Sequence, residues 1–172
     1  PVMYSNTCLL FKKGWRGINI DINPTSTDLF KILRPKDFNI CTNIDENKKD
    51  FKIFYDHPFS PVNTLDETYY KNFKGKFFKE ISQKIVKSKT VDEILNLANI
   101  NNADFLNIDV EGMDYKILTQ LVPNKLKPEL ISIETHNVDG SKTQDCDKIN
   151  GFLNNSNFRI LKRVGPSTLF HR

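Results

Sequence analysis

The sequence predicts an α/β fold, with a doubly wound, mostly parallel sheet, helices on both faces and an antiparallel hairpin at the C-terminal end. Three short apolar segments indicate this fold, because each closes on acidic or imidazole side chains: residues 18–21, 105–111 and 130–136. Helical patterns separate these segments, and strands that alternate with helices are typical of parallel sheets. Their polar ends therefore predict a ligand crevice at the carboxyl edge of the sheet.

The predicted helices follow from apolar spacing and from start and stop residues. The first ends at Gly14, and the second is capped by Ser26 or Thr27. The second ends before Arg34-Pro35, since a residue that precedes proline disfavours helical geometry. Thr90 caps the third, which carries apolar residues at helical spacing. The predicted helices cover residues 5–13, 26–33, 90–98, 115–121 and 145–154.

The predicted strands are short apolar or alternating segments. Residues 50–55 alternate apolar and polar side chains, which favours a half-exposed edge strand. Gly165-Pro166 joins the last two strands and predicts a hairpin. Residues 56–79 lack clear periodicity, and we interpret them as a mobile or substrate-covering segment. The predicted strands cover residues 18–21, 38–42, 50–55, 84–86, 105–110, 130–134, 158–163 and 168–170.

The composition predicts one domain over residues 1–172 of an ordinary globular kind, with 38% hydrophobic and 27% charged residues. The net charge of +4 comes from dispersed lysines, and residues 71–89 are interpreted as a solvated face rather than a nucleic-acid surface. Neither a membrane span nor a signal peptide is recognisable. Cys8, Cys41 and Cys146 are far apart, which argues against a disulfide framework or structural zinc and favours a reducing cytoplasm.

Asp21 is the leading candidate for binding a ligand. It ends the strand in Gly14-Trp15-Arg16-Gly17-Ile18-Asn19-Ile20-Asp21-Ile22-Asn23-Pro24. A carboxylate at the end of the second strand of a doubly wound sheet can accept hydrogen bonds from both ribose hydroxyls, so the position favours an adenosyl cofactor. The alternative is a turn residue at the end of a strand.

That segment resembles the FkbM family of methyltransferases, as does Phe105-Leu106-Asn107-Ile108-Asp109-Val110-Glu111-Gly112. Ser5-Asn6-Thr7, Arg34-Pro35, Asn63-Thr64-Leu65 and Ile131-Ser132-Ile133-Glu134 are similar to further blocks of the family. The resemblance covers nearly the whole chain. It implies S-adenosylmethionine as methyl donor, a Rossmann-like class I methyltransferase fold of seven strands, and O-methylation of hydroxyls on sugars or secondary metabolites.

The start of the chain differs from the family pattern, which opens with a strand and a glycine-rich turn for the cofactor. The sequence begins almost at the first helix, so we interpret it as lacking that strand and turn. Ser5 and Asn6 could then bind the cofactor carboxylate at the helix start, or simply cap the helix. After the second predicted strand, Ile44 could pack the adenine ring while Asn43 or Asp45 accepts from its amino group; the alternative is an ordinary Asx turn.

Asp109 and Glu111 follow the strand beside the expected methyl group. They could contact the sulfonium, orient a substrate hydroxyl or bind a divalent cation, or they could complement a helix dipole. Glu134 and His136 lie two residues apart at the next strand end and should face the same side. The His136 imidazole is the candidate general base, with Glu134 as its orienting partner.

The sequence therefore predicts a cytoplasmic, S-adenosylmethionine-dependent O-methyltransferase that acts on a hydroxyl of a carbohydrate, glycolipid or secondary metabolite. The partner is a small-molecule or glycan acceptor rather than a nucleic acid. Two alternatives remain: a metal-assisted enzyme that uses Asp109, Glu111 and perhaps His136 as ligands, and a catalytically inactive nucleotide-binding or interaction module.

Overall fold

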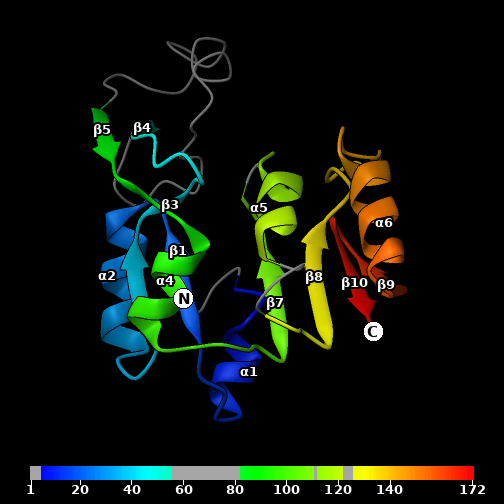
Figure 1. Ribbon diagram of the computed structural model, residues 1–172, viewed down its shortest axis with the longest axis horizontal. Coiled ribbons are helices and arrows are strands. Elements are labelled where there is room, and N and C mark those ends of the chain that lie inside the picture. Colours follow the sequence, from blue (N-terminus) through cyan, green and yellow to red (C-terminus); the bar gives the residue numbers. More distant parts are fainter. Residues whose placement is uncertain (1–4, 56–81, 111, 122–125) are drawn as a thin grey trace. The chain divides into compact units, whose positions relative to one another are not determined.

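The computed structural model describes residues 5–55, 82–110, 112–121 and 126–172. They belong to two compact units, Pro1–Ala98 and Asn99–Arg172. The described strands pair in four sheets, which contain both parallel and antiparallel pairs (Figure 1). The predicted alternation of strands and helices is confirmed, whereas a single, mostly parallel sheet remains a prediction. The predicted mobile segment lies outside the described residues. None of the described helices is long and apolar enough to cross a membrane.

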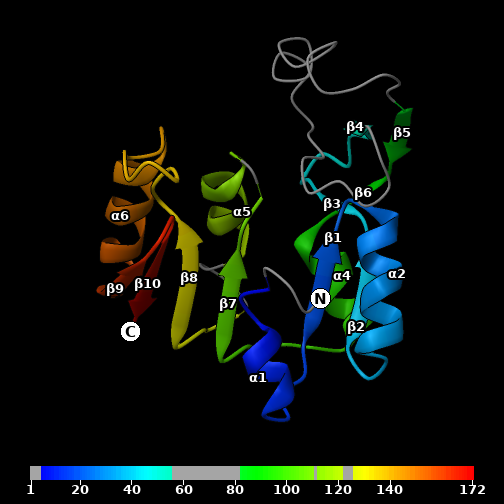
Figure 2. The same cartoon turned by 180° about the vertical axis from the view of Figure 1, so that it is seen from behind.

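The first unit contains a strand–helix–strand motif. Strand β1 (Ile18–Asp21) pairs in parallel with β2 (Phe38–Cys41), and helix α2 (Pro24–Leu33) connects them. Figure 2 shows α2 lying alongside this strand pair. Because the strands are parallel and in register, Asp21 and Cys41 lie side by side at their carboxyl ends. Both strands were predicted from the sequence, β1 with its observed bounds.

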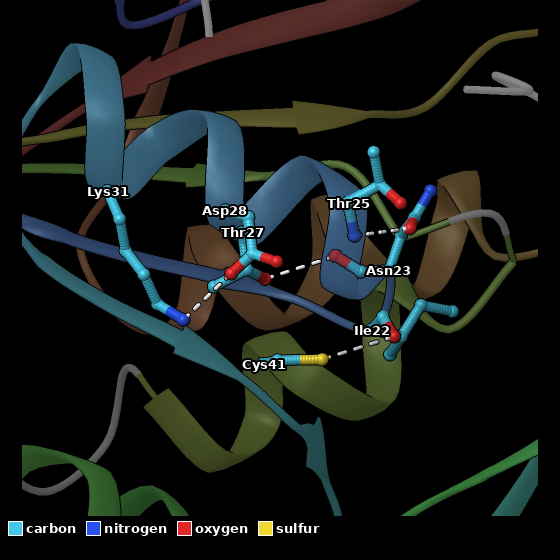
Figure 3. A network of polar contacts seen from close by, with 7 residues as sticks. All are labelled: Ile22, Asn23, Thr25, Thr27, Asp28, Lys31 and Cys41. Atoms are coloured by element: carbon cyan, nitrogen blue, oxygen red, sulfur yellow. Dashed lines mark hydrogen bonds and ion pairs between the residues drawn. The ribbon is translucent and has the colours of Figure 1, made fainter. Parts of the chain in front are cut away.

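The cap of α2 corrects the prediction that named Ser26 or Thr27. Asn23 is the N-cap, and its side-chain oxygen accepts from the Thr25 backbone N–H at 2.9 Å (Figure 3). Pro24 then occupies the first helical position, where its lack of an N–H costs nothing. The Thr27 hydroxyl instead donates to the Asn23 carbonyl at 3.1 Å, inside the first turn. The Asn-Pro pair therefore starts the helix earlier than predicted.

The rest of the first unit consists of short elements. Helix α1 (Cys8–Lys12) is shorter than predicted. The two-residue strands β3 (Asn43–Ile44) and β6 (Ser88–Lys89) pair in parallel and were not predicted. Strands β4 (Phe51–Tyr55) and β5 (Ser82–Val86) form an antiparallel pair.

Helix α4 (Val91–Ala98) closes the first unit and begins as predicted. The Thr90 hydroxyl accepts from the Glu93 backbone N–H at 3.2 Å, and the Glu93 carboxylate accepts from the Thr90 backbone N–H at 2.9 Å. This reciprocal arrangement is a capping box. The prediction that Thr90 caps the helix is confirmed.

The second unit is built on a mixed four-stranded sheet in the order β7-β8-β10-β9. Strand β7 (Phe105–Ile108) is parallel to β8 (Leu130–Glu134), while β10 (Ser167–His171) is antiparallel to both β8 and β9 (Arg159–Val164). The two-residue turn at Gly165-Pro166 forces this antiparallel return, and Gly165 adopts a φ of 59° there. The predicted C-terminal hairpin is confirmed.

Two helices complete the second unit. Helices α5 (Asp114–Leu121) and α6 (Cys146–Asn155) contact each other, and the Tyr115 and Phe152 rings meet edge to face at 6.2 Å. Helix and sheet residues together form a fully buried core: Leu118, Ile131, Ile133, Leu153, Phe158 and Phe170. This packing fixes the carboxyl end of β8 and the start of α6, where residues of both elements line a cavity.

Candidate functional site

Asp21 ends β1 as the sequence predicts, and its carboxylate already has local partners. One oxygen accepts from the Asn23 backbone N–H at 2.8 Å, and the Ser26 side chain also hydrogen-bonds to the carboxylate. Partial burial raises the pKa of Asp21, and these hydrogen bonds oppose that rise. A carboxylate offers about four acceptor positions. The turn role and a ribose contact are therefore compatible at this residue.

The neighbouring strand end is tied to the turn after β1. The exposed Cys41 thiol donates to the Ile22 carbonyl at 3.5 Å (Figure 3), and the Thr42 backbone N–H donates to the Asp21 carbonyl at 3.0 Å. These contacts hold the carboxyl ends of β1 and β2 together. Asp21 consequently stands in a fixed position between a helix start and a neighbouring strand.

Ser5 and Asn6 do not cap the first helix, which corrects that alternative. Thr7 is the N-cap residue, without a side-chain capping bond, and Asn6 is exposed. The Arg34 guanidinium instead donates to the Thr7 hydroxyl at 2.8 Å and the Ser5 hydroxyl at 3.0 Å. Arg34 itself is buried, so it fixes the segment that carries Ser5 to the end of α2.

Asn43, Ile44 and Asp45 are all buried, and the two polar side chains have structural partners. The Asn43 amide donates to the Ser88 hydroxyl at 3.1 Å, across the β3-β6 pair. The Asp45 carboxylate accepts from the Asn47 backbone N–H at 2.8 Å, which is an Asx turn. The turn alternative is thus observed at Asp45, and an adenine contact by this segment stays a prediction.

A cavity of about 400 Å³ lies at the carboxyl end of β8 in the second unit. Glu134 and His136 both line it, as expected for two residues separated by one position at a strand end. The chain thus brings a carboxylate and an imidazole into one pocket. The remaining lining residues are Gly112, Asp114, Asn137, Val138, Thr143, Gln144, Asp145, Ile149 and Pro166.

His136 is held in place by both its backbone and its ring. The backbone N–H donates to the Pro166 carbonyl at 3.1 Å, and the residue forms a β-bridge with Lys142. On the ring, Nδ1 lies 2.8 Å from the Thr135 hydroxyl. The other ring nitrogen, Nε2, is therefore the one left for a ligand in the cavity. The sequence analysis did not single out Thr135.

The carboxylates that follow β7 separate into two environments. Asp109 does not line the cavity, although surrounding protein atoms partly desolvate its carboxyl and raise its pKa. Asp114 does line it and is buried, and its two oxygens accept from the Val110 and Gly112 backbone N–H groups at 3.4 and 3.2 Å. Desolvation raises the pKa of Asp114, and the Asp109 charge raises it further. Glu111 lies outside the described residues.

Asp114 is a cavity residue that the sequence analysis missed. The available signal was an acidic residue at the start of a helical pattern, two positions after a turn glycine, Gly112, with a φ of 89°. An acidic residue in this position is typical of the first turn of a helix, so it did not indicate a ligand-binding role. Its place in the cavity depends on how α5 packs against β7 and α6, which a local sequence pattern cannot predict.

The metal-assisted alternative stays a prediction, because Glu111, one of its expected ligands, lies outside the described residues. Among them, no group of three or more His, Cys, Asp or Glu side chains is placed to hold a metal ion. Asp109 and His136, two of the predicted ligands, do not line the same cavity.

The full sequence was compared with curated proteins, with solved structures and with models of protein families. No curated protein and no solved structure matches it. A family model described as the methyltransferase FkbM domain matches residues 2–160. The mixed α/β architecture is compatible with a methyltransferase fold. This match spans nearly the full sequence, and the chain belongs to the FkbM family of methyltransferases.

Proposed function

We propose that this methyltransferase uses S-adenosylmethionine to methylate a hydroxyl oxygen of a carbohydrate, glycolipid or secondary metabolite. The main supporting observation is the cavity at the end of β8, which is lined by both Glu134 and His136. A hydroxyl acceptor needs a pocket, a partner that orients it and a group that takes its proton. These side chains can supply the last two.

The donor would be held by residues of the first unit. Asp21 is suited to the ribose because its carboxylate keeps acceptor positions beyond those used by the turn. Ser5 is a candidate for the carboxylate end of the cofactor, since Arg34 fixes its hydroxyl. When bound, S-adenosylmethionine supplies a methyl group made electrophilic by the positive sulfonium.

The acceptor would be handled by residues of the second unit. The His136 imidazole takes the proton that the acceptor hydroxyl loses as its oxygen is methylated. Glu134 was predicted to orient His136; because Nδ1 of that ring contacts Thr135 instead, we give Glu134 the role of orienting the acceptor hydroxyl. Imidazole suits this task because its ordinary pKa lies close to neutrality. Asp109 and Glu111 remain candidates for contacts with the sulfonium or the acceptor.

The polarity of the cavity favours an uncharged acceptor. Carboxylates of Asp114, Glu134 and Asp145 and the amides of Asn137 and Gln144 line it, and no lysine or arginine does among the described residues. Carboxylate and amide groups can hydrogen-bond to neighbouring hydroxyls of a sugar. An acceptor with a phosphate or carboxylate group would meet like charge and be disfavoured.

The free thiols at Cys8, Cys41 and Cys146 agree with a cytoplasmic location.

Calorimetric titration with S-adenosylhomocysteine tests the donor site. We expect the chain to bind it and Asp21→Ala to bind it at least about tenfold more weakly, because loss of charge-assisted hydrogen bonds costs about 1.5–3 kcal/mol. Asp28→Ala is the matched control, since Asp28 is an exposed carboxylate on α2, the helix that follows Asp21, and pairs with Lys31. Absence of binding by the folded protein would contradict the proposal.

Methyl-transfer assays with neutral sugars test the acceptor site. Removing a general base typically costs about 10²- to 10⁴-fold in rate, so His136→Gln should lose most methyl-transfer activity while still binding S-adenosylhomocysteine. His171→Gln is the control, because His171 is exposed at the end of β10. Cofactor binding without turnover on any acceptor would instead support the inactive binding module.

A further inference from the structure

Strand β9 forms one edge of the sheet in the second unit, and its outer edge has no partner among the described strands (Figure 2). All six of its residues are exposed. A strand covered on one face would bury every second side chain, since successive side chains point to opposite faces. Both faces of β9 are therefore open to solvent, in addition to its outer edge.

Large apolar side chains take part in this exposure. Ile160 and Leu161 are each 57% exposed, and Val164 is 56% exposed. The register between β9 and β10 shifts at Leu161, which has no partner on β10 and is the extra residue of a β-bulge. Single exposed apolar residues are normal on a protein surface, whereas three on one short strand indicate a surface that another structure covers.

The other three residues of β9 are basic: Arg159, Lys162 and Arg163. No ion pair between described residues involves any of them. The paired strand β10 carries no acidic residue that could compensate their charge. The β9 surface, which we define as residues 159–164, thus combines apolar side chains with a local excess of positive charge.

We propose that the β9 surface docks on a lipid bilayer that carries anionic head groups. Basic side chains are attracted to such a surface, while neighbouring apolar side chains enter the boundary between head groups and acyl chains. The docking is interfacial, because the unpaired backbone groups of an edge strand need water or head groups and would be costly in hydrocarbon. This inference goes beyond the proposed function and does not depend on it.

Other occupants fit the β9 surface less well. A second copy paired edge to edge would bring the basic side chains of the two chains close to one another, which is unfavourable. Proteins that bind single-stranded nucleic acids stack the bases on aromatic side chains, and β9 has none. Protection of the edge against aggregation would explain the basic residues but not the apolar ones. An anionic bilayer accounts for both kinds of side chain.

The β9 surface leads to the cavity of the second unit. Val164 is followed by the turn at Gly165-Pro166, and Pro166 lines the cavity. Val138 also lines the cavity and is 96% exposed, so a further apolar side chain stands at its rim. A docked protein would therefore hold the cavity close to the lipid head groups.

Flotation with vesicles tests the proposal. The protein is mixed with vesicles of phosphatidylcholine and phosphatidylglycerol in equal amounts, or of phosphatidylcholine alone. We expect salt-sensitive binding to the anionic vesicles and little binding to the neutral ones, because salt screens the attraction. Lys162→Gln combined with Arg163→Gln should weaken binding to the anionic vesicles by about tenfold or more. Leu161→Ser should weaken it by about fivefold, because less apolar area is buried.

The controls change the same kinds of group elsewhere on the protein. Lys12→Gln combined with Lys13→Gln removes two neighbouring exposed basic residues at the end of α1. Ile32→Ser removes an apolar side chain that is 73% exposed on α2. Both control variants should bind the anionic vesicles as the wild type does. Circular dichroism checks that every variant is folded, and Leu161→Ala replaces Leu161→Ser if the latter is not.

The outcomes decide for or against the β9 surface. Absence of binding to anionic vesicles by the folded wild type would overturn the proposal. Equal losses in the β9 variants and in their controls would also overturn it, since the binding would then follow from the net charge of +4. A dimer, or binding of single-stranded DNA, that is lost in the β9 variants while vesicle binding is unchanged would assign the surface to that partner instead. Methyl transfer is no part of these measurements, so failure of the proposed function would leave them unaffected.

Discussion

Arg34 should be one of the most sensitive positions in the first unit. Its side chain is buried at 2% exposure, it donates to the Ser5 and Thr7 hydroxyls, and its guanidinium lies 5.0 Å from the Phe11 and Phe30 ring centroids. Arg34→Ala removes all of these contacts at once. It should therefore loosen the start of the chain from the end of α2.

The expected loss can be worked out from these contacts. A hydrogen bond to a charged donor contributes about 1.5–3 kcal/mol when buried, although the two hydroxyls here are only half-buried and regain water. A desolvated cation–π contact contributes about 2 kcal/mol. Since such terms overlap, we expect Arg34→Ala to lower the free energy of unfolding by about 3 kcal/mol. Arg34→Lys should recover less than half, because an ammonium group lacks the planar fork.

Urea unfolding followed by tryptophan fluorescence measures this loss. Trp15 is the single tryptophan and its backbone N–H donates to the Leu10 carbonyl at 3.1 Å, so it reports on the region after α1. Arg163→Ala, on the exposed strand β9, is the control and should stay within about 0.5 kcal/mol of wild type. A loss below about 1 kcal/mol for Arg34→Ala, or full recovery by lysine, would refute the reasoning.

Three further predictions follow from other contacts. Asn23→Ala should lower the free energy of unfolding by about 1 kcal/mol in urea titrations, whereas Asn23→Asp should cost little because it keeps the capping oxygen. Gly165→Ala should destabilise by about 1 kcal/mol because of its positive φ, while Gly151→Ala, inside α6 with open space at its Cβ, should stabilise by about 0.5–1 kcal/mol. Asp109→Asn should lower the pKa of Asp114 measured by ¹³C NMR, since the Asp109 charge raises it. Because the pKa of Asp114 is raised in the folded state, the folded state binds more protons than the unfolded state, and the free energy of unfolding falls as pH rises from the ordinary aspartate pKa to the raised pKa of Asp114. Asp109→Asn should make this fall smaller.

The elements that could be predicted from the sequence are those with local signals. Strands β1 and β8 have their predicted bounds because each contains regularly placed isoleucines and ends at an acidic residue. The capping box at Thr90 also lies within four residues. By contrast, β3 and β6 are two residues long and pair across about 45 positions, so no local pattern reports them. The Asn23 cap was missed because three nearby polar residues compete for that role, and Pro24 decides between them.

In the candidate site, too, some features follow from local sequence patterns and others depend on contacts between residues far apart in the sequence. The positions of Glu134 and His136 at one strand end follow from strand periodicity, which is local. The contacts of Arg34 with Ser5 and of Thr135 with Thr168 join residues 29 and 33 positions apart. Both depend on how elements pack. Sequence reasoning therefore finds the groups that could do chemistry, and the folded chain is needed to find those that hold them.

The choice of a hydroxyl behind His136 is consistent with the rest of the cavity. Asp114, Glu134 and Asp145 already bring carboxyl groups to its lining, and burial raises the pKa of Asp114. A further carboxylate at the position of Thr135, which is 1% exposed, would add a buried charge whose desolvation costs several kcal/mol. The Thr135 hydroxyl lies 2.8 Å from Nδ1 of the imidazole without that cost and without adding to the repulsion between acidic groups. The neutral partner thus adds no further charge to a lining that already holds Asp114, Glu134 and Asp145.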